Sequence, residues 1–292
     1  MPSEVPGGIT ALIHTKNEEA RIEYAVRSCR GWTDHVLVVD MASTDATREV
    51  ALRAGATILP VPDFGFADPA RQLAVDAVTT DWVFVLDADE IAPITLGERL
   101  VTIARANAVD VVRIPHLNYF FGRPLRTTDW APEHDRHPRF FRRGSLEVSK
   151  VVHQPWTVAK DARVVDLPAR DELCIHHLSY PTVASFVAKM NSYTDIEARE
   201  LLAATRSAPT AGRALVAGGR EFLRRYIKNR GYRDDYRAFI VSYLMITYRL
   251  LAWAKARQLA DMGDEAAIQE HHRQVAEQLL AEGDGRGDSA AP

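Results

Sequence analysis

Three carboxylates follow an apolar run in the segment WVFVLDADE, residues 82–90. The run predicts a buried strand, and Asp87, Asp89 and Glu90 stand within four residues at its end. Because side chains two apart in an extended chain point the same way, Asp87 and Asp89 can face one ligand while Ala88 faces the interior. Carboxylates at this spacing suit Mg²⁺ or Mn²⁺, which keep waters and take further ligands from a substrate diphosphate. The competing interpretation is that these acids cap the helix or turn that follows.

A second acid stands at the end of another predicted strand. Asp40 follows the apolar run HVLVV, residues 35–39. Ligands of open parallel sheets bind beyond the carboxyl ends of the strands, so two strands that end in Asp predict one shared site. A strand-end Asp equally serves turns, and for Asp40 both interpretations stay open.

The elements that must position these acids alternate along the first third of the chain. Apolar runs predict strands at residues 9–15, 35–40, 57–62 and 82–87, and amphipathic stretches predict helices at 18–29, 43–56 and 68–78. This alternation predicts an α/β fold with a Rossmann-like, mostly parallel sheet and helices on both faces. A helix at 95–107 and an extended segment at 110–121 follow, and the chain is predicted to be helical from residue 183 onward.

The bulk properties exclude several classes of protein. With a net charge of −3 and a pI near 6.4, the chain has no overall attraction to nucleic acid. Cys29 and Cys174 lack metal-ligand spacing, which favours free thiols in a reducing, cytoplasmic setting. The first residues lack the basic and apolar segments of a secretory signal, and no apolar run is long enough to cross a bilayer.

Several motifs together carry a resemblance to a known family. The segments TKNEE (15–19), VVDMASTDAT (38–47), ARQLAVDAV (70–78) and WVFVLDADE resemble glycosyltransferase family 2, which has the GT-A fold. The closer likeness is to the lipopolysaccharide-core β-1,4-glucosyltransferase-like branch. This resemblance implies a metal-dependent inverting enzyme that moves a hexose from a nucleotide sugar, with UDP as the expected nucleotide. The expected acceptor is a glycan or lipid-linked glycan, as in cell-envelope polysaccharide synthesis.

The resemblance also implies site residues. It implies a nucleotide-sugar pocket lined by Thr15, Asn17, Glu18, Asp40, Arg71 and Asp87. Asp40 would meet the base or ribose and Asp87 the ribose side, while Arg71 is alternatively a solvated helix charge. Asp89 would hold Mg²⁺ or Mn²⁺ on the diphosphate, and His177 would complete the metal shell.

An inverting enzyme needs a general base on the acceptor side. The resemblance places this base at Asp135, with Glu133 and Glu147 as competitors and a structural ion pair as the alternative role. The sequence departs from the branch at Gln154, where Glu is usual, and at Gln72, where Asn is common. Trp130 is expected either to stack on a sugar ring or to pack as an ordinary aromatic residue.

The C-terminal third is basic. Between residues 213 and 257 there are eleven Lys or Arg and three acidic residues, and they enclose the apolar run 238–248. This pattern suits contact with an anionic membrane surface, or packing against the catalytic domain or a second subunit. We expect a GT-A domain at 1–180, a helical region at 181–282 that makes acceptor, membrane or oligomer contacts, and a disordered tail at 283–292.

Three other functions use similar sequence features. A phosphohydrolase of the haloacid dehalogenase type also has an apolar strand followed by Asp-x-Asp, but there the motif ordinarily ends the first strand. A nucleotidyltransferase would need a Gly-rich loop after the first strand, which IHTKNEE lacks. The third alternative is a non-catalytic, membrane-associated module that binds nucleotide sugars.

Overall fold

The computed structural model describes residues 4–63, 68–147, 156–204 and 210–287. The chain divides into two compact units, Met1–Thr182 and Val183–Pro292. All the predicted site residues belong to the first unit, whereas the basic segment lies in the second.

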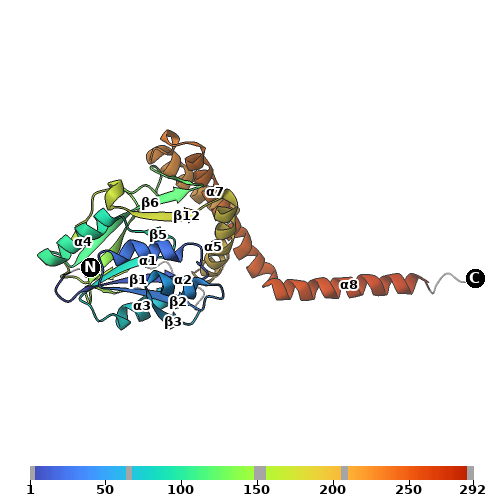
Figure 1. The fold of residues 1–292 in the computed structure, drawn as a ribbon. Helices are drawn as coiled ribbons and strands as arrows, with labels where there is room; N and C mark the ends of the chain where they lie inside the picture. The colour runs from blue at the N-terminus through green and yellow to red at the C-terminus, as the bar shows by residue number, and fades with distance from the viewer. Residues whose placement is uncertain (1–3, 64–67, 148–155, 205–209, 288–292) are drawn as a thin grey trace, which may run out of the picture. The chain divides into compact units, whose positions relative to one another are not determined.

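The first unit is built on a ten-stranded sheet (Figure 1). Its strands are β1 (Ile9–Thr15), β2 (His35–Met41), β3 (Thr57–Val61), β4 (Trp82–Asp87), β5 (Glu90–Ile91), β6 (Val111–Phe120), β7 (Arg123–Pro124), β8 (Arg136–Arg142), β11 (Val164–Asp166) and β12 (Ile175–Tyr180). The main order is β3-β2-β1-β4-β8-β6-β12-β5, with β7 and β11 paired to β6. Strands β1 to β4 are parallel, and β8 runs antiparallel between β4 and β6. A separate pair is formed by β9 (Leu146–Glu147) and β10 (Thr157–Val158).

Helices cover both faces of this sheet, as the sequence predicts. One face carries α1 (Ile22–Arg30), α2 (Thr47–Ala54) and α4 (Ile94–Ala106), and the other carries α3 (Asp68–Ala77). The alternation along β1 explains the two layers, because Ile9, Ala11 and Ile13 enter the first core and Leu12 enters the second. A short 3₁₀ turn, η1 (Asp171–Leu173), precedes β12.

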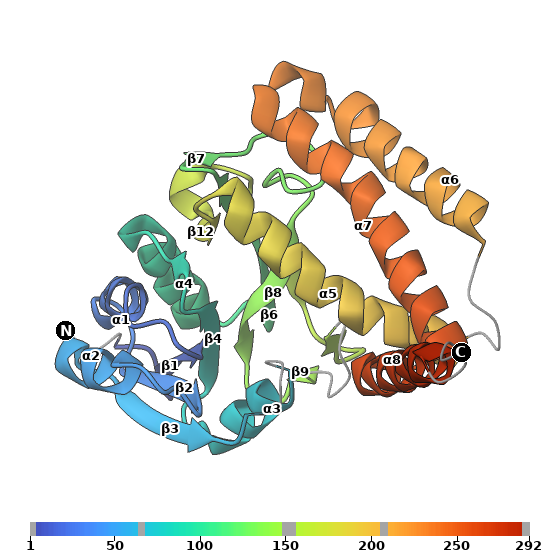
Figure 2. The same cartoon turned by 90° about the vertical axis from the view of Figure 1, so that its right-hand side faces the viewer.

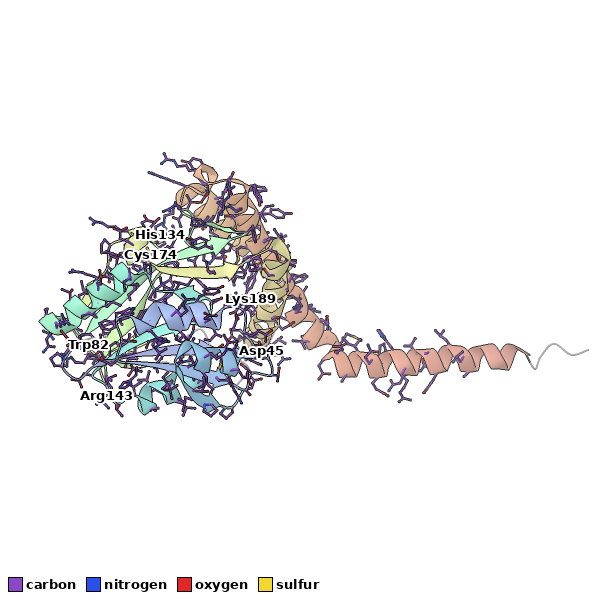
Figure 3. All side chains as sticks on the ribbon, in the orientation of Figure 1. Asp45, Trp82, His134, Arg143, Cys174 and Lys189 are labelled. Atoms are coloured by element: carbon purple, nitrogen blue, oxygen red, sulfur yellow. The ribbon has the colours of Figure 1, made fainter. Side chains whose placement is uncertain are left out.

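Aromatic stacking fixes the start of β4 against β8, at the edge away from the acidic motif. Trp82 stacks on Phe140 with ring centroids 4.7 Å apart, and the Arg142 guanidinium lies 5.1 Å from the Trp82 ring. The backbone N–H of Arg143 donates to the carbonyl of Asp81, beside Trp82 (Figure 3). This antiparallel pairing carries β8 alongside β4 and so brings its earlier residues toward the acids.

The second unit is helical among the described residues, as the sequence predicts. It consists of α5 (Val183–Ala204), α6 (Ala211–Phe222), the π-helical turn η2 (Leu223–Lys228), the 3₁₀ turn η3 (Gly231–Arg233), α7 (Tyr236–Met262) and α8 (Glu265–Gly287). Helix α7 packs against α5 and α6 (Figure 2). The approach of α6 is close, since a Cβ on Gly218 would meet the Ile246 backbone at 2.9 Å.

The apolar run 238–248 packs only partly, with Ala238, Val241 and Ser242 buried in α7. Helix α8 runs to Gly287 and so includes residues 283–287 of the predicted tail. Residues 288–292 lie outside the described residues. Within the described ranges, no helix has the length and apolar content to cross a bilayer.

Candidate active site

The predicted acids gather at the carboxyl edge of the sheet because neighbouring parallel strands end together. In the ladder register Thr15 of β1 lies opposite Asp40 of β2, and His14 lies opposite Asp87 of β4. Thr15 and Asp40 are buried, and the Thr15 hydroxyl and one Asp40 oxygen have no hydrogen-bond partner among the described residues. The other Asp40 oxygen accepts from Arg48 Nε at 2.5 Å. Polar atoms buried without partners at a strand end favour a ligand there.

Asp87 is held by two arginines. Its oxygens accept from Arg71 Nη2 at 2.8 Å and from Arg139 Nη2 at 3.1 Å. Burial alone would raise the pKa of Asp87, but the charges of Arg71 and Arg139 outweigh it and hold the pKa well below its ordinary value. Arg71 is therefore not the solvated helix charge that was the alternative, since only 18% of its side chain is exposed.

Asp87 and Asp89 have different partners among the described residues. Residues 88–89 form a turn between β4 and β5, so the two-residue alternation stops at Asp87. Ala88 is buried, as expected, and the expectation that both carboxylates face one ligand stays a prediction.

Both carboxylate oxygens of Glu90 bind other residues of the protein. Glu90 is fully buried, one oxygen accepts from the backbone N–H of Asp87 at 2.8 Å, and the other lies 3.0 Å from Arg139 and 3.2 Å from His116 Nε2. Burial opposes its ionisation, yet the Arg139 charge lowers the pKa of Glu90 to about 2. Glu90 therefore connects the turn after β4 to β8 through Arg139 and to β6 through His116.

Asp89 faces His177 of β12. Asp89 Oδ2 lies 3.5 Å from His177 Nε2 and 3.8 Å from Arg21 Nη1. The Asp89 side chain is 14% exposed and that of His177 is 25% exposed, so both are accessible to a ligand. Burial lowers the pKa of His177, but the contact with Asp89 and the charge of Glu90 outweigh it, and the net shift is upward.

Asn118 of β6 joins His177 to Asp135. Its Nδ2 donates to Asp135 Oδ2 at 2.6 Å and to the carbonyl of Trp130 at 3.0 Å. Its Oδ1 accepts from His177 Nδ1 at 2.8 Å. The predicted base and the predicted metal ligand are therefore connected through one buried amide.

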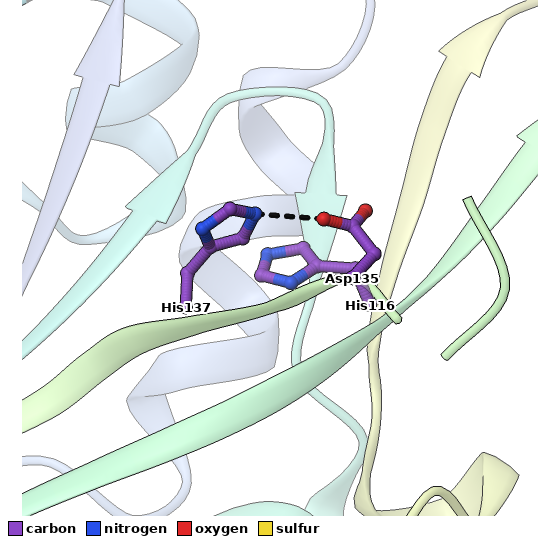
Figure 4. A group of neighbouring side chains, drawn as sticks. All are labelled: His116, Asp135 and His137. Carbon is purple, nitrogen blue, oxygen red and sulfur yellow. Dashed lines mark hydrogen bonds and ion pairs between the residues drawn. The ribbon is translucent and has the colours of Figure 1, made fainter. Parts of the chain in front are cut away.

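Asp135 contacts His137, and His116 lies close to both (Figure 4). His137 Nε2 donates to Asp135 Oδ1 at 2.7 Å, and the His116 ring lies at 5.1 Å from the His137 ring. Burial works to raise the pKa of Asp135, but the hydrogen bond from His137 and the nearby His116 outweigh it, so the carboxyl is held ionised. One ligand atom from each of His116, Asp135 and His137 lies within 4.8 Å of the others, which is a spacing that could hold a metal ion.

These side chains line a common pocket. The lining residues are Glu90, His116, Asn118, Phe120, Trp130, Asp135, His137, Arg139, His177, Ser179 and Tyr180. They come from β5, β6, β8, β12 and the segment before β8. Of the competitors for the base, Glu133 is exposed and does not line this pocket, and the side chain of Glu147 lies outside the described part of the chain. Gln154, the departure from the branch, also lies outside the described residues.

The TKNEE segment is bound to the loop before α2. Asn17, at φ 54°, accepts from the backbone N–H of Thr44 at 2.8 Å, and its own N–H donates to Ser43 at 2.9 Å. The Glu18 carboxylate accepts from Arg21 Nε at 2.6 Å and Nη2 at 2.7 Å. Because Ser43 and Thr44 bind Asn17 of the TKNEE segment, α2 starts at Thr47 and not at the predicted residue 43.

Comparison with known proteins identifies the family. A match to Glycosyl transferase family 2 covers residues 10–157, slightly more than half of the chain. The chain belongs to glycosyl transferase family 2. This membership favours glycosyl transfer over the phosphohydrolase and nucleotidyltransferase alternatives.

Relatives within the family extend beyond the matched region. An uncharacterized glycosyltransferase of Rickettsia bellii is 26% identical over 263 residues, which cover 86% of this chain and 87% of the relative. One of Rickettsia typhi is 26% identical over 258 residues, with the same coverage. Glucosyl-3-phosphoglycerate synthase from Mycobacterium tuberculosis, solved with Mn²⁺, UDP and glucosyl-3-phosphoglycerate, is 25% identical at a TM-score of 0.33. That likeness covers 38% of this chain and 44% of the synthase, too little to carry a conclusion about substrate.

The residues of this family 2 protein fit the divalent metal that the GT-A fold implies. Two ligands of one Mg²⁺ or Mn²⁺ lie about 3 Å apart in an octahedral shell. Asp89 Oδ2 and His177 Nε2, at 3.5 Å, need only a small shift to reach that spacing. One carboxylate oxygen and one imidazole nitrogen leave positions for water and phosphate oxygens, and the nitrogen favours Mn²⁺ over Mg²⁺.

Several residues of the site have no assigned role in the sequence predictions. A buried ionic cluster is formed by Arg139, Glu90 and His116. Asn118 connects Asp135 with His177. The sequence does offer a signal for a role of Asn118, because this polar residue interrupts the apolar and aromatic run LNYFF. Its partners come from β12 and from the segment before β8, and no local pattern specifies those pairings.

Proposed function

We propose that this family 2 protein is a metal-dependent inverting glycosyltransferase that moves a hexose from a UDP-linked sugar to a glycan or lipid-linked glycan. The observation that carries the proposal is the pairing of Asp89 with His177, which Asn118 connects to Asp135. A ligand pair for a cation and an ionised carboxylate in one site are what leaving-group stabilisation and acceptor activation require.

The donor pocket in this proposal lies over the ends of β1, β2 and β4. Its residues are Thr15, Asn17, Glu18, Asp40, Arg71 and Asp87. The unpartnered buried oxygens of Thr15 and Asp40 would meet the nucleoside. Asn17 and Glu18 would act mainly by shaping the loop, since their side chains already bind Thr44 and Arg21.

Asp89 and His177 would hold the metal, Mg²⁺ or Mn²⁺. When bound, such an ion neutralises the charge that develops on the departing diphosphate. We place this ion at Asp89 and His177 because Asp89 lies two residues after Asp87 of the proposed donor pocket, and His116, Asp135 and His137 are the alternative ligand set. Arg21, at 3.8 Å from Asp89, keeps a fixed positive charge beside the same phosphates.

Asp135 would accept the proton of the acceptor hydroxyl as that hydroxyl attacks the anomeric carbon from the face opposite the diphosphate. Asn118 and His137 hold its two oxygens at 2.6 and 2.7 Å, which fixes the direction of the carboxylate. Trp130, whose ring lies 5.1 Å from that of Phe120 on the pocket wall, offers an aromatic face to a sugar.

The second unit supports a lipid-linked acceptor at the cytoplasmic face of a membrane, as in the lipopolysaccharide-core branch and cell-envelope synthesis. Leu223 and Ile227 of η2 are 58% and 53% exposed, and the exposed basic residues Arg220 and Lys228 lie on the same helical segment. On α7, Tyr236, Phe239 and Tyr243 form an exposed aromatic stripe at helical spacing. Apolar and aromatic groups bordered by cations suit an anionic lipid surface.

Binding of nucleotide sugars tests the function. Isothermal titration of the full chain with UDP-glucose, UDP-galactose, GDP-mannose and dTDP-glucose, each with and without Mn²⁺, should give metal-dependent binding of a UDP-linked sugar. Release of UDP on addition of glycan or glycolipid acceptors then measures transfer. Binding without transfer would favour the non-catalytic module, and absence of any nucleotide-sugar binding would overturn the proposal.

A further inference from the structure

We infer that Asn118 is a positioning residue that fixes which ring nitrogen of His177 faces the metal and ties that ligand to the Asp135 base. The inference rests on the proposed function, because it assigns Asn118 a role toward the Asp89–His177 pair. Asn118 touches neither the acidic motif nor the donor pocket residues in its hydrogen bonds, so its effect is exerted through its neighbours.

The orientation of the Asn118 amide is determined by its partners. Its nitrogen side meets the Asp135 carboxylate at 2.6 Å and the Trp130 carbonyl at 3.0 Å, and both partners only accept hydrogen bonds. A flipped amide would put its oxygen against two acceptors, so the amino group must point there. The carbonyl oxygen of Asn118 therefore faces His177.

This orientation of the Asn118 amide determines which nitrogen of the His177 ring carries a hydrogen. Because Asn118 Oδ1 can only accept, His177 Nδ1, 2.8 Å away, must carry a hydrogen. In the neutral ring the lone pair then lies on Nε2, which is the nitrogen 3.5 Å from Asp89 Oδ2. His177 is thus held in the tautomer that places its lone pair beside the other metal ligand.

The Asn118 amide also connects the metal ligand His177 with the base Asp135. Asn118 is 2% exposed, and both its amino hydrogens and its carbonyl are engaged, so it has little freedom to rotate. A shift of His177 toward a bound cation is transmitted through this rigid amide to Asp135. The metal ligand lies on β12, and the base lies just before β8. Strand β6, which carries Asn118, lies between β8 and β12 in the sheet and so connects the two residues.

The test compares two substitutions of similar size. Asn118→Leu removes the amide and should weaken Mn²⁺ binding in the presence of UDP by about 10- to 100-fold, the range for partners of metal-bound histidines. Asn118→Asp keeps an oxygen that accepts from His177 Nδ1 whether or not the new carboxyl is protonated, so it should retain Mn²⁺ affinity within about 3-fold. A merely structural role would not predict rescue by Asp. Calorimetric titration of Mn²⁺ into the UDP-bound full chain gives the affinities.

A measurement on the unmodified chain covers the case in which Asn118→Leu does not fold. In ¹⁵N-histidine-labelled protein saturated with Mg²⁺ and UDP, with the His177 signal assigned by its loss in His177→Gln, the ring should carry its proton on Nδ1 and none on Nε2. A proton on Nε2 in that complex would overturn the inference.

The outcomes separate this inference from the proposed function. If the unmodified chain binds no Mn²⁺ with UDP, the proposed function fails. If Asp89→Asn abolishes Mn²⁺ binding while Asn118→Leu leaves it unchanged, the function stands and the inference fails. Loss of Mn²⁺ affinity in His137→Gln, together with unchanged affinity in Asp89→Asn, would place the ion among His116, Asp135 and His137 and contradict the inference.

Discussion

His177 Nε2 lies 3.5 Å from Asp89 Oδ2, although the two residues come from different segments of the sheet. Asp87, only two residues from Asp89, is instead enclosed by Arg71 and Arg139. Neighbouring acids in the sequence therefore have separate surroundings, and the consequences of removing each should differ.

Substitution of Asp89 and Asp87 should affect different properties. Asp89→Asn should weaken Mn²⁺ binding in the presence of UDP by at least about 10-fold with little change in stability. Asp87→Asn removes the carboxylate that both Arg71 and Arg139 contact, which leaves Glu90 as the carboxylate beside Arg139, and should cost about 3 kcal/mol of unfolding free energy. Calorimetry and urea denaturation of both variants test this contrast. Equal loss of stability in the two variants would contradict it.

Asp135→Asn should lower the turnover of UDP-sugar by about 100- to 10,000-fold, because the proton of the attacking hydroxyl loses its acceptor. The affinity for UDP-sugar should stay unchanged, since Asp135 contacts Asn118 and His137 and none of the donor pocket residues. Steady-state assays of UDP release combined with calorimetry make the comparison. Glu133→Gln, which alters an exposed acid outside the pocket, is the matched control. Near-normal turnover of Asp135→Asn would exclude Asp135 as the base.

Stability should fall as the pH is lowered from about 6.5, because of His14. Burial, with the nearby Arg71 charge, lowers the pKa of His14 from 6.5 to about 3. Between these values the unfolded chain binds a proton that the folded chain does not, so the unfolding free energy decreases toward acid by at most about 1.4 kcal/mol per pH unit. The lowered pKa of His116 adds to this trend with the same sign.

His14→Leu should flatten this dependence. Urea denaturation at pH values between about 5 and 6.5 measures the slope above the range in which most carboxylates titrate. His35→Leu removes an exposed imidazole from β2 and serves as the comparison. A slope that His14→Leu leaves unaltered would show that another group causes the acid sensitivity.

Gly97→Ala should destabilise the first unit despite the helix preference of alanine. A Cβ at Gly97 would lie 2.4 Å from Cδ1 of Trp32, whose buried ring packs edge-on against Phe84. Overpacking of this kind costs about 1–3 kcal/mol, which exceeds the roughly 1 kcal/mol that alanine contributes to a helix. In Gly219→Ala, where nothing lies within 4 Å of the added Cβ, the helix preference should act alone. Thermal unfolding would contradict this if Gly97→Ala were the more stable of the two.

Charge reversal on the second unit should weaken binding to anionic vesicles. Each basic residue near an anionic surface contributes about 1 kcal/mol, so Arg220→Glu with Lys228→Glu should lower partitioning at least about 30-fold. Sedimentation with phosphatidylcholine vesicles, with and without phosphatidylglycerol, measures this. Arg53→Glu with Arg99→Glu makes the same charge change at exposed positions of the first unit. Similar loss in both double variants, or equal binding to neutral vesicles, would contradict a membrane contact through the second unit.

Much of the first unit's order could be predicted from local patterns. β1 and β4 match their predicted bounds, and β2 extends its own by one residue, because apolar β-rich runs between helical segments define buried strands. Helix starts were predicted less well at α2, where Ser43 and Thr44 bind the TKNEE loop instead of capping the helix. Such a contact depends on a segment far away in the chain and leaves no local trace.

The sequence by itself determined that carboxylates stand at the ends of buried strands, and that the motifs are those of glycosyl transferase family 2. Only the tertiary structure decided which acid is enclosed by arginines and which faces a histidine. That decision depends on β8 inserting between β4 and β6, which brings Arg139 to Asp87, and on β12 pairing with β5, which brings His177 to Asp89. Hydrophobic periodicity specifies the face of each strand but not its neighbour, so these pairings arise only when the sheet is assembled.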